Sequence, residues 1–289
     1  MDSRVRECAG LDADDIDFLH RVEAGLRITA DVSRADALLC CLLKPHEALV
    51  VQHALPRSIS SLYRESATGQ ILRSDGQPLL FRTFNGGSGG HQQKETPNSG
   101  APIIQDVQPI TRDGKRVIGA LLFETNMLAH ERQRRRNRSF RQAVLWLQQM
   151  CLAGELESTR NLSRFGLYDG IYLVDHHRVI TYMNGIAGNM LRSIGLMANL
   201  QGKRVAELEP VDEEMVESAF SSRQCHEQRT ESMMAAFGSA RRFRSRPGPT
   251  TLRISGSICR GWANAAPTTF PRFWSWSTMP QRLWRNSEN

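Results

Sequence analysis

Two neighbouring histidines, His176 and His177, form the only His-His pair in the chain and are the first candidates for chemistry. Imidazole nitrogens are common ligands of metal ions and haem. Asp175 precedes the pair and Arg178 follows it, a composition that favours a turn between two strands. No further ligand residues accompany the pair at the spacing of known metal sites. We therefore expect two solvated turn histidines and no metal site.

A glycine-rich segment at residues 85–90 has the composition of a phosphate-binding loop. Such loops direct backbone N–H groups and the start of a following helix at the anion. Here Gln, Pro and Gly residues follow instead of a helical pattern, and no Lys-Ser or Lys-Thr pair closes the motif. This departure favours a surface loop over a phosphate site.

Five arginines lie between positions 132 and 138, where they could contact nucleic acid or anionic lipid. Aromatic residues are not interleaved with them, and arginine suits the solvated face of a helix. Nucleic acid is therefore not the expected partner. The six cysteines form no C-x-x-C pair, which indicates reduced thiols in a cytoplasmic protein. No apolar run approaches the roughly 20 residues that span a bilayer, and we expect no membrane association.

The last 50 residues differ in composition from the rest. Residues 240–289 contain nine Arg and one acid, whereas residues 1–239 hold 28 basic and 29 acidic side chains. The basic balance of the chain therefore belongs to this tail. Read one base earlier, the codons of segment 273–277 give a hydrophobic strand that leads towards Asp-Ala-Thr-Glu. We therefore hypothesise a frameshift between positions 232 and 262; a genuine disordered basic tail is the alternative.

The first 128 residues show an α+β pattern, in which a helix precedes mostly antiparallel strands. Asp12, Asp14 and Asp15 suit the start of a helix whose apolar positions recur at helical spacing up to residue 31. Apolar runs predict strands at 37–43, 48–53, 71–73, 78–84, 107–111 and 117–124. A long loop rich in Gly, Ser, Asn and Pro is expected between residues 85 and 102.

Residues 130–155 predict one long helix, which would connect the first domain to the next one. Its apolar residues recur along one stripe, at a spacing that suits a seam between two helices. We therefore expect a homodimer whose seam contains Phe140, Val144, Leu147, Met150 and Cys151.

A second unit begins near Asp169. Residues 171–174 predict a strand, 175–178 a tight turn and 179–183 the returning strand, after which Asn184 opens a helix. Each unit is expected to enclose a small, partly apolar ligand cavity, with plain core packing as the alternative. The candidate lining residues are Phe81, Phe84, Leu121 and Phe123 in the first unit, and Ile171, Leu173, Tyr182 and Met190 in the second. The bound cofactor or ligand stays unknown.

Residues 169–209 resemble the first half of a PAS domain. The segment DGIYLVDHHRVITYMN is similar to the opening hairpin of that family, and LQGKRVAELEP to its middle segment. Upstream, DFLHRVEAGLRITADVSRADALLC and GALLFETNM resemble the GAF-like N-terminal domain of a family of soluble bacterial sensor histidine kinases. The segment ERQRRRNRSFRQAVLWLQQM resembles the connector of the same kinases, so that the resemblance covers residues 5–230.

The resemblance implies a GAF-like sensory domain at 1–128, a connector and dimerisation helix at 129–160, a partial PAS domain at 161–235 and a tail at 236–289. The implied function is signal input to a two-component histidine kinase, through a small ligand or a conformational change. In such kinases ATP and Mg²⁺ serve autophosphorylation on His, and a response regulator receives the phosphate.

The family's phosphoacceptor motif, Glu-x-His-His-Arg-x-Lys-Asn-Asn, does not occur in this sequence, nor do its ATP-binding motifs. No catalytic residue is carried over, and we expect the chain as given not to transfer phosphate. The alternative function is a free-standing GAF/PAS binding module whose basic tail contacts nucleic acid or an acidic protein.

Overall fold

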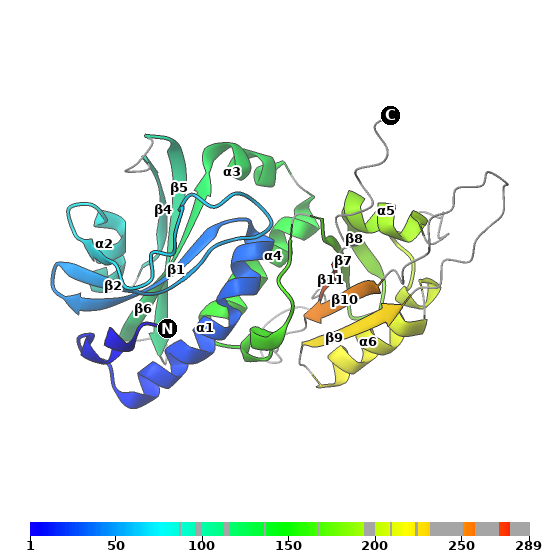
Figure 1. Cartoon of the computed structure of the whole chain (residues 1–289), viewed down its shortest axis with the longest axis horizontal. Coiled ribbons are helices and arrows are strands. Elements are labelled where there is room, and N and C mark those ends of the chain that lie inside the picture. Colours follow the sequence, from blue (N-terminus) through cyan, green and yellow to red (C-terminus); the bar gives the residue numbers. More distant parts are fainter. Residues whose placement is uncertain are drawn as a thin grey trace, which may run out of the picture. The chain divides into compact units, whose positions relative to one another are not determined.

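The computed structural model describes residues 1–86, 88–95, 100–112, 116–135, 137–166, 168–193, 200–208, 210–222, 225–231, 251–257 and 272–277 (Figure 1). The described residues up to 166 form one compact unit, and those from 168 onwards form a second. Within these ranges, none of the helices has the length and the apolar character needed to cross a bilayer.

The first unit is built on a six-stranded antiparallel sheet with the strand order β3-β2-β1-β6-β5-β4. The strands are β1 (Asp36–Lys44), β2 (Glu47–Ala54), β3 (Ile71–Arg73), β4 (Gly90–Glu95), β5 (Pro102–Arg112) and β6 (Arg116–Asn126). The helices are η1 (Ser3–Glu7), α1 (Ala13–Ser33), α2 (Pro78–Gly86), α3 (Met127–Arg134), α4 (Arg138–Leu152) and η2 (Glu157–Asn161). The strands predicted at 37–43, 48–53, 71–73, 107–111 and 117–124 are confirmed.

Acidic residues fix the start of α1, as the sequence predicts. Asp12 and Asp15 form a capping box, in which each side chain accepts a hydrogen bond from the other residue's amide. Arg112, which ends β5, and Arg116, which begins β6, reach this end of the helix and pair with the fully buried Asp15. These contacts hold α1 against the sheet.

The sheet of the first unit buries both faces. On one face α1 crosses the sheet closely, since a Cβ added at Gly119 of β6 would stand 3.2 Å from the Leu19 side chain. On the other face, Leu80 and Phe81 of α2 share a core with Ala120 and Leu122 of β6. Side chains alternate between the faces along each strand, so neighbouring residues belong to different cores.

The long helix expected at 130–155 is two helices, α3 and α4. Asn137 caps the second, with its Oδ1 accepting a hydrogen bond from the Ser139 amide at 2.8 Å. Figure 1 shows α4 lying along α1, and the Cys151 thiol lies 3.6 Å from the Val22 carbonyl oxygen of α1. Of the stripe proposed as a dimer seam, Phe140, Val144, Leu147 and Cys151 are buried within the unit and Met150 is half-buried.

Two segments differ from the sequence-based expectations. Residues 78–84, expected as a strand, form helix α2, because Pro78 suits a first helical position and apolar Leu79, Leu80 and Phe81 cover one core. Part of the expected loop at 85–102 forms the edge strand β4, which pairs with β5 over its whole length. Its residues alternate between exposed and half-buried, as an edge strand with few apolar residues does.

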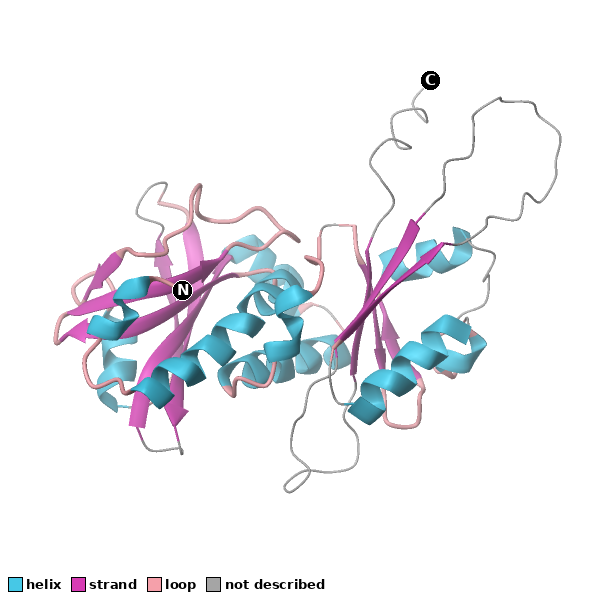
Figure 2. Ribbon diagram, turned by 60° about the horizontal axis from the view of Figure 1, so that its bottom comes forward, coloured by secondary structure: helices cyan, strands magenta, loops and turns pink. Residues whose placement is uncertain are grey.

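The second unit contains a five-stranded antiparallel sheet with the strand order β8-β7-β11-β10-β9. Figure 2 shows α5 (Gly185–Ser193) and α6 (Pro210–Ser222) on the same side of this sheet, where Leu191 and Val216 join Tyr172 in one core. A short helix, η3, spans Val205–Glu207. The strands are β7 (Gly170–Val174), β8 (Ile180–Met183), β9 (His226–Glu231), β10 (Thr251–Ser257) and β11 (Arg272–Ser277).

Strands β10 and β11 come from the region that the sequence analysis assigned to a tail. β11 pairs with β7, and β10 pairs with β11 and β9, so these segments fill the middle of the sheet. In β11 large aromatic residues alternate with serines, the period-2 pattern of a strand. The tight turn at 175–178 is confirmed, since the Asp175 carboxylate accepts hydrogen bonds from the His177 and Val179 amides.

The acidic start of α1 gives the first testable prediction. Burial alone would raise the pKa of Asp15, but the hydrogen bond from the Asp12 amide and the guanidinium groups of Arg112 and Arg116 lower it. Asp15→Asn should therefore lower the free energy of unfolding at pH 7 by about 1–2 kcal/mol. Because the pKa is lowered on folding, the difference should shrink as the pH falls below the unfolded value of about 3.9.

Urea unfolding at neutral and acidic pH measures this difference, and Asp14→Asn is the matched control. Asp14 pairs with Arg112, but its side chain is 75% exposed, so its loss should cost little. Equal losses in the two variants, or a loss that does not depend on pH, would contradict the assignment.

Candidate functional site

A row of polar side chains crosses the sheet of the first unit on the face that α2 covers. Gln92 on β4, Gln105 on β5, Glu124 on β6 and Asp36 on β1 stand directly opposite one another in successive strand pairs. Gln105, Glu124 and Asp36 are buried, with at most 3% of each residue exposed. We call these four residues the polar row.

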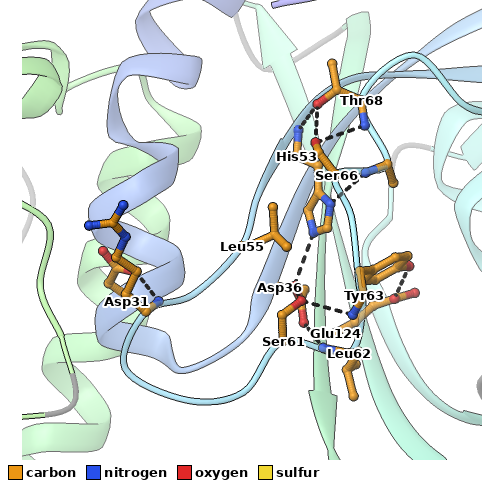
Figure 3. Close-up of polar contacts among 12 residues, drawn as sticks. Asp31, Asp36, His53, Leu55, Ser61, Leu62, Tyr63, Ser66, Thr68 and Glu124 are labelled. Carbon is orange, nitrogen blue, oxygen red and sulfur yellow. Dashed lines mark hydrogen bonds and ion pairs between the residues drawn. The ribbon is translucent and has the colours of Figure 1, made fainter.

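A loop between β2 and β3, residues 55–70, folds over Asp36 at one end of this row (Figure 3). The Asp36 carboxylate accepts hydrogen bonds from the Ser61 hydroxyl at 2.5 Å and from the Leu62 amide at 2.8 Å. It also lies 3.2 Å from Nε2 of the buried His53. We call residues 55–70 the roof loop, because its backbone and side chains close this end of the row.

His53 links Asp36 to the far end of the roof loop. Its Nδ1 accepts a hydrogen bond from the Ala67 amide at 3.0 Å, so the ring proton lies on Nε2 and points to Asp36. The His53 amide in turn donates to the Thr68 hydroxyl oxygen at 2.9 Å. Figure 3 shows the ring between these partners, and the Tyr63 ring packs edge-on against it with centroids 4.7 Å apart.

Glu124 holds the middle of the roof loop. The Tyr63 hydroxyl donates to Glu124 Oε2 at 2.6 Å, and the Gln105 amide group donates to Oε1 at 2.6 Å. Gln105 donates also to Gln77, which precedes α2. Burial, and then the nearby Glu124 carboxyl group, raise the pKa of Tyr63 well above its ordinary value. The tyrosine therefore stays a hydrogen-bond donor.

All four carboxyl oxygens of Asp36 and Glu124 accept hydrogen bonds from protein donors. Such groups are costly to bury unless they are fully paired. The arrangement therefore fixes the roof loop against the sheet. A bound molecule that shifts the loop has to supply donors to the same carboxyl oxygens.

The thiols near these cores are poorly suited to nucleophilic chemistry. Burial, and then the Glu124 carboxyl group, raise the pKa of Cys40, which lies on the same face as the polar row. Burial raises the pKa of Cys151 to about 12. Since the thiolate is the reactive form, these cysteines act as small apolar core residues.

The first set of proposed pocket residues is divided between the two faces of the sheet. Phe81 is buried and Phe84 half-buried in the core beneath α2, with ring centroids 6.1 Å apart. Leu121 and Phe123 are buried on the opposite face, because the residues of β6 that join Phe81 are Ala120 and Leu122. These four side chains therefore do not line one cavity.

The second set is divided in the same way. Met190 packs with the core that contains Tyr172, whereas Ile171 and Leu173 have the other parity on β7. Tyr182 stands opposite Leu173 and is half-buried. On the same face of the sheet as Met190, the hydroxyl of Tyr172 in β7 donates a buried hydrogen bond to Asp212 at 2.8 Å.

The histidine pair lies at the turn, as expected from the sequence. His177 is exposed and His176 half-buried, and they line an open groove of about 580 Å³. Arg178 and Arg204 line the same groove together with Glu213 and Glu217. Arg178 adopts a left-handed backbone conformation with a φ of 66°, and its guanidinium group pairs with Glu217 and stacks on Phe220.

The other two candidate motifs lie in ordinary positions. Gly86 ends α2 and Gly90 begins β4, so in the described part of segment 85–90 no helix starts that could receive a phosphate. Gly87 lies outside the described residues. Arg132 and Arg134 belong to α3, Arg135 to the turn that follows it, and Arg138 begins α4; Arg136 lies outside the described residues.

A family model of the GAF domain of the histidine kinase PdtaS matches residues 1–144, which include the whole six-stranded sheet. Residues 1–144 are a GAF domain of the PdtaS histidine-kinase family. The chain is also 25% identical over 199 residues to the sensor histidine kinase PdtaS of two Mycobacterium tuberculosis strains, CDC 1551 / Oshkosh and ATCC 25618 / H37Rv. The match covers 65% of this chain and 39% of each relative, so the chain spans about two fifths of their length.

A solved structure of the sensor region of a sensor histidine kinase has a similar fold. It has a TM-score of 0.61 and 17% sequence identity, and the match covers 94% of each chain. The GAF assignment agrees with the α+β fold and the antiparallel sheet predicted from the sequence.

Sequence reasoning missed the polar row and the roof loop of the GAF domain. The available signal was the position of Asp36 and Glu124, which stand at the ends of apolar runs in β1 and β6; Gln105, among other polar residues of β5, gave no such signal. A polar residue in such a run is often buried and paired. The register that places the three side by side follows from strand pairing, which no local pattern states.

The contact between Tyr63 and Glu124 gives a second prediction. Tyr63→Phe should lower the free energy of unfolding of the GAF domain by about 1.5–3 kcal/mol, because a buried carboxyl group loses a donor. Since the pKa of Tyr63 is raised on folding, the wild type should also lose stability as the pH rises above about 10. The variant should lack this part of the alkaline loss.

Urea unfolding, with hydrogen exchange of the β1 and β6 amides as the readout, measures the loss of stability and its dependence on pH. Tyr168→Phe, at a tyrosine that is 58% exposed, is the control and should change little. A Tyr63→Phe variant as stable as this control would show that the hydroxyl contributes nothing.

Proposed function

We propose that this chain is the signal-input region of a two-component histidine kinase. The observation that carries the proposal is the match of residues 1–144 to the PdtaS GAF family, on a domain whose buried carboxyl groups hold a loop rather than form a catalytic site. The input would be a small ligand or a conformational change at the roof loop. We place the protein in the cytoplasm.

The second unit is proposed to be a PAS-type sensor. Its support is the antiparallel sheet order β8-β7-β11-β10-β9, with both helices on one face, together with the sequence likeness of its opening hairpin. Asn184, expected to open a helix, accepts hydrogen bonds from the Ile171 and Ala187 amides and so joins β7 to α5. In this proposal β10 and β11 belong to the domain, which extends beyond residue 235.

The output belongs to the whole kinase. In the PdtaS family we expect ATP and Mg²⁺ to serve autophosphorylation on a histidine, followed by transfer to a response regulator. The chain supplies no catalytic residue for these steps in our proposal. It biases them through the conformation of the sensor domains.

A chimeric kinase tests the input function. The whole chain is fused to the catalytic region of the Mycobacterium tuberculosis PdtaS kinase, in place of the part that it matches, and autophosphorylation is measured with labelled ATP. Glu124→Gln, which weakens the hold on Tyr63, should change the rate severalfold, whereas the unfused chain should incorporate no phosphate. Glu65→Gln, at an exposed residue of the same roof loop, is the matched control. Equal rates in all three fusions would refute control by this loop.

We also propose that the protein is a homodimer. The seam predicted at Phe140, Val144, Leu147, Met150 and Cys151 is mostly covered by α1 in the described chain, so its use would require α4 to leave α1. The outer side of α4 presents Leu145, which is 51% exposed, and offers a contact that needs no rearrangement.

Sedimentation velocity tests the dimer and its contact. The wild type should sediment as a dimer, and Leu145→Glu should shift it to a monomer because a charge would be buried in the interface. Ile71→Glu, at an exposed residue of edge strand β3, is the control and should stay dimeric. A monomeric wild type would refute the proposed homodimer. A dimeric Leu145→Glu variant would show that Leu145 does not lie in the dimer interface.

A further inference from the structure

The segment after α4, residues 153–166, runs back over α1. The Thr159 hydroxyl donates to the Ala24 carbonyl oxygen of α1 at 3.1 Å. Leu156 is fully buried against Gly25 of α1. A Cβ added at Gly25 would stand 2.5 Å from the Cβ of Leu156. We call residues 153–166 the strap, because they are tied along α1 within the first unit.

The end of the strap is tied to a buried carboxylate. The Arg164 guanidinium group donates to both carboxylate oxygens of Asp31 at 2.8 Å, a two-pronged ion pair. The Asp31 side chain is completely buried, whereas that of Arg164 is 23% exposed. A buried carboxylate of this kind depends strongly on its cation.

The same carboxylate holds the start of the roof loop. The Arg57 amide donates to Asp31 Oδ1 at 2.7 Å. The Ser58 hydroxyl donates to the Asp31 carbonyl oxygen. Arg164 itself donates to the Leu55 carbonyl oxygen at 2.6 Å, so strap and loop meet directly as well as through Asp31.

Continuous contacts therefore run from the polar row to the strap. Asp36 and Glu124 hold the middle of the roof loop, at Ser61 and at Tyr63. Asp31 and Arg164 hold its start, four to eight residues earlier in the chain. The strap leads on to Tyr168, where the second unit begins.

We propose that Asp31 couples the roof loop to the strap, so that a shift of the loop over the polar row loosens the Arg164 ion pair and frees the chain segment that leads to the second unit. The Arg57 amide and the Arg164 guanidinium group donate to the same oxygen, Asp31 Oδ1. Arg164 also donates to the Leu55 carbonyl oxygen, two residues before Arg57. A displacement of residues 55–58 therefore changes the geometry of the ion pair. The use of this coupling in signalling rests on the proposed input function, but the coupling itself does not.

A coupling of this kind is reciprocal: a change in either segment affects the other. A contact that only fastens the strap to α1 would lack this property. If Asp31 joins two movable segments, loosening the strap must also loosen the roof loop, although the substituted residue lies outside that loop. A staple that only fastens the strap would leave the amides over the polar row unchanged.

Hydrogen exchange on the full chain, read by mass spectrometry without any ligand, tests this. Arg164→Gln should speed exchange roughly tenfold both in the strap and at the roof-loop amides of Leu62, Tyr63 and Ala67. Arg160→Gln is the matched control in the same strap, because the contact of Arg160 within the described residues is a hydrogen bond to the His20 carbonyl oxygen at the surface and does not involve Asp31. It should leave the roof loop at the wild-type rate.

The reverse variant, Ser61→Ala, should speed exchange at the strap amides of Thr159 and Leu162. Amides of β1 and β6 report whether a variant has lost its global fold; if Arg164→Gln has, Arg164→Lys is read by the same criterion. Faster exchange confined to the strap in the Arg164 variant, or an unchanged strap in Ser61→Ala, would overturn the proposal. Failure of the chimeric kinase to respond, with the coupling intact, would instead count against the input function alone.

Discussion

The first unit depends on the pairing of β1 with β6, which places Asp36 directly across from Glu124 in the middle of the sheet. Two carboxyl groups side by side in a core would be unstable without donors for every oxygen. The sheet itself supplies Gln105 and His53, and the roof loop supplies the hydroxyls and amides that remain. The fold therefore needs the loop, and these bonds in turn fix the position of the loop.

The need of the two carboxyl groups for donors explains why a loop of 16 residues without regular secondary structure has a defined conformation over the core. Besides the packing of Ala67 and Tyr63 in the core beneath α2, its hold is polar and specific, whereas the contacts beneath α1 are mainly apolar. Water or a polar molecule can compete for a hydrogen bond, whereas it cannot replace the packing of Leu or Ile side chains. The two faces of the sheet therefore differ: α1 packs on one, whereas the other carries helix α2 together with a loop that is held by hydrogen bonds to buried carboxyl groups.

Much of the fold is dictated by local patterns. The acidic start of α1, the β5–β6 hairpin and the turn at Asp175–Arg178 are each encoded by neighbouring residues. The segment 78–84 was assigned wrongly because a short apolar run fits a strand or a helix equally well, and only its packing across the sheet decides. The strands β10 and β11 were not expected, because the Arg-rich composition of the tail, with a single acid, outweighed the period-2 pattern of β11.

The site was harder to predict than the fold, for reasons of parity. Leu121 and Phe123 were grouped with Phe81 by their apolar character, yet a shift of one residue along β6 reverses the face. The stripe on α4 has a correct period, but period alone does not identify the partner, which is α1 of the same chain. Buried polar residues carry more information here than the apolar ones, because each one demands a partner.

The contact between Gly25 and Leu156 restricts how this chain can vary. Glycine within a helix costs about 1 kcal/mol relative to alanine, a cost that α1 bears at a buried position. Even a methyl group there would overlap Leu156, so the residue is closed to every larger side chain as long as the strap stays docked. Among relatives, a larger residue at this position would mark proteins whose sensor is joined to its next domain along a different path.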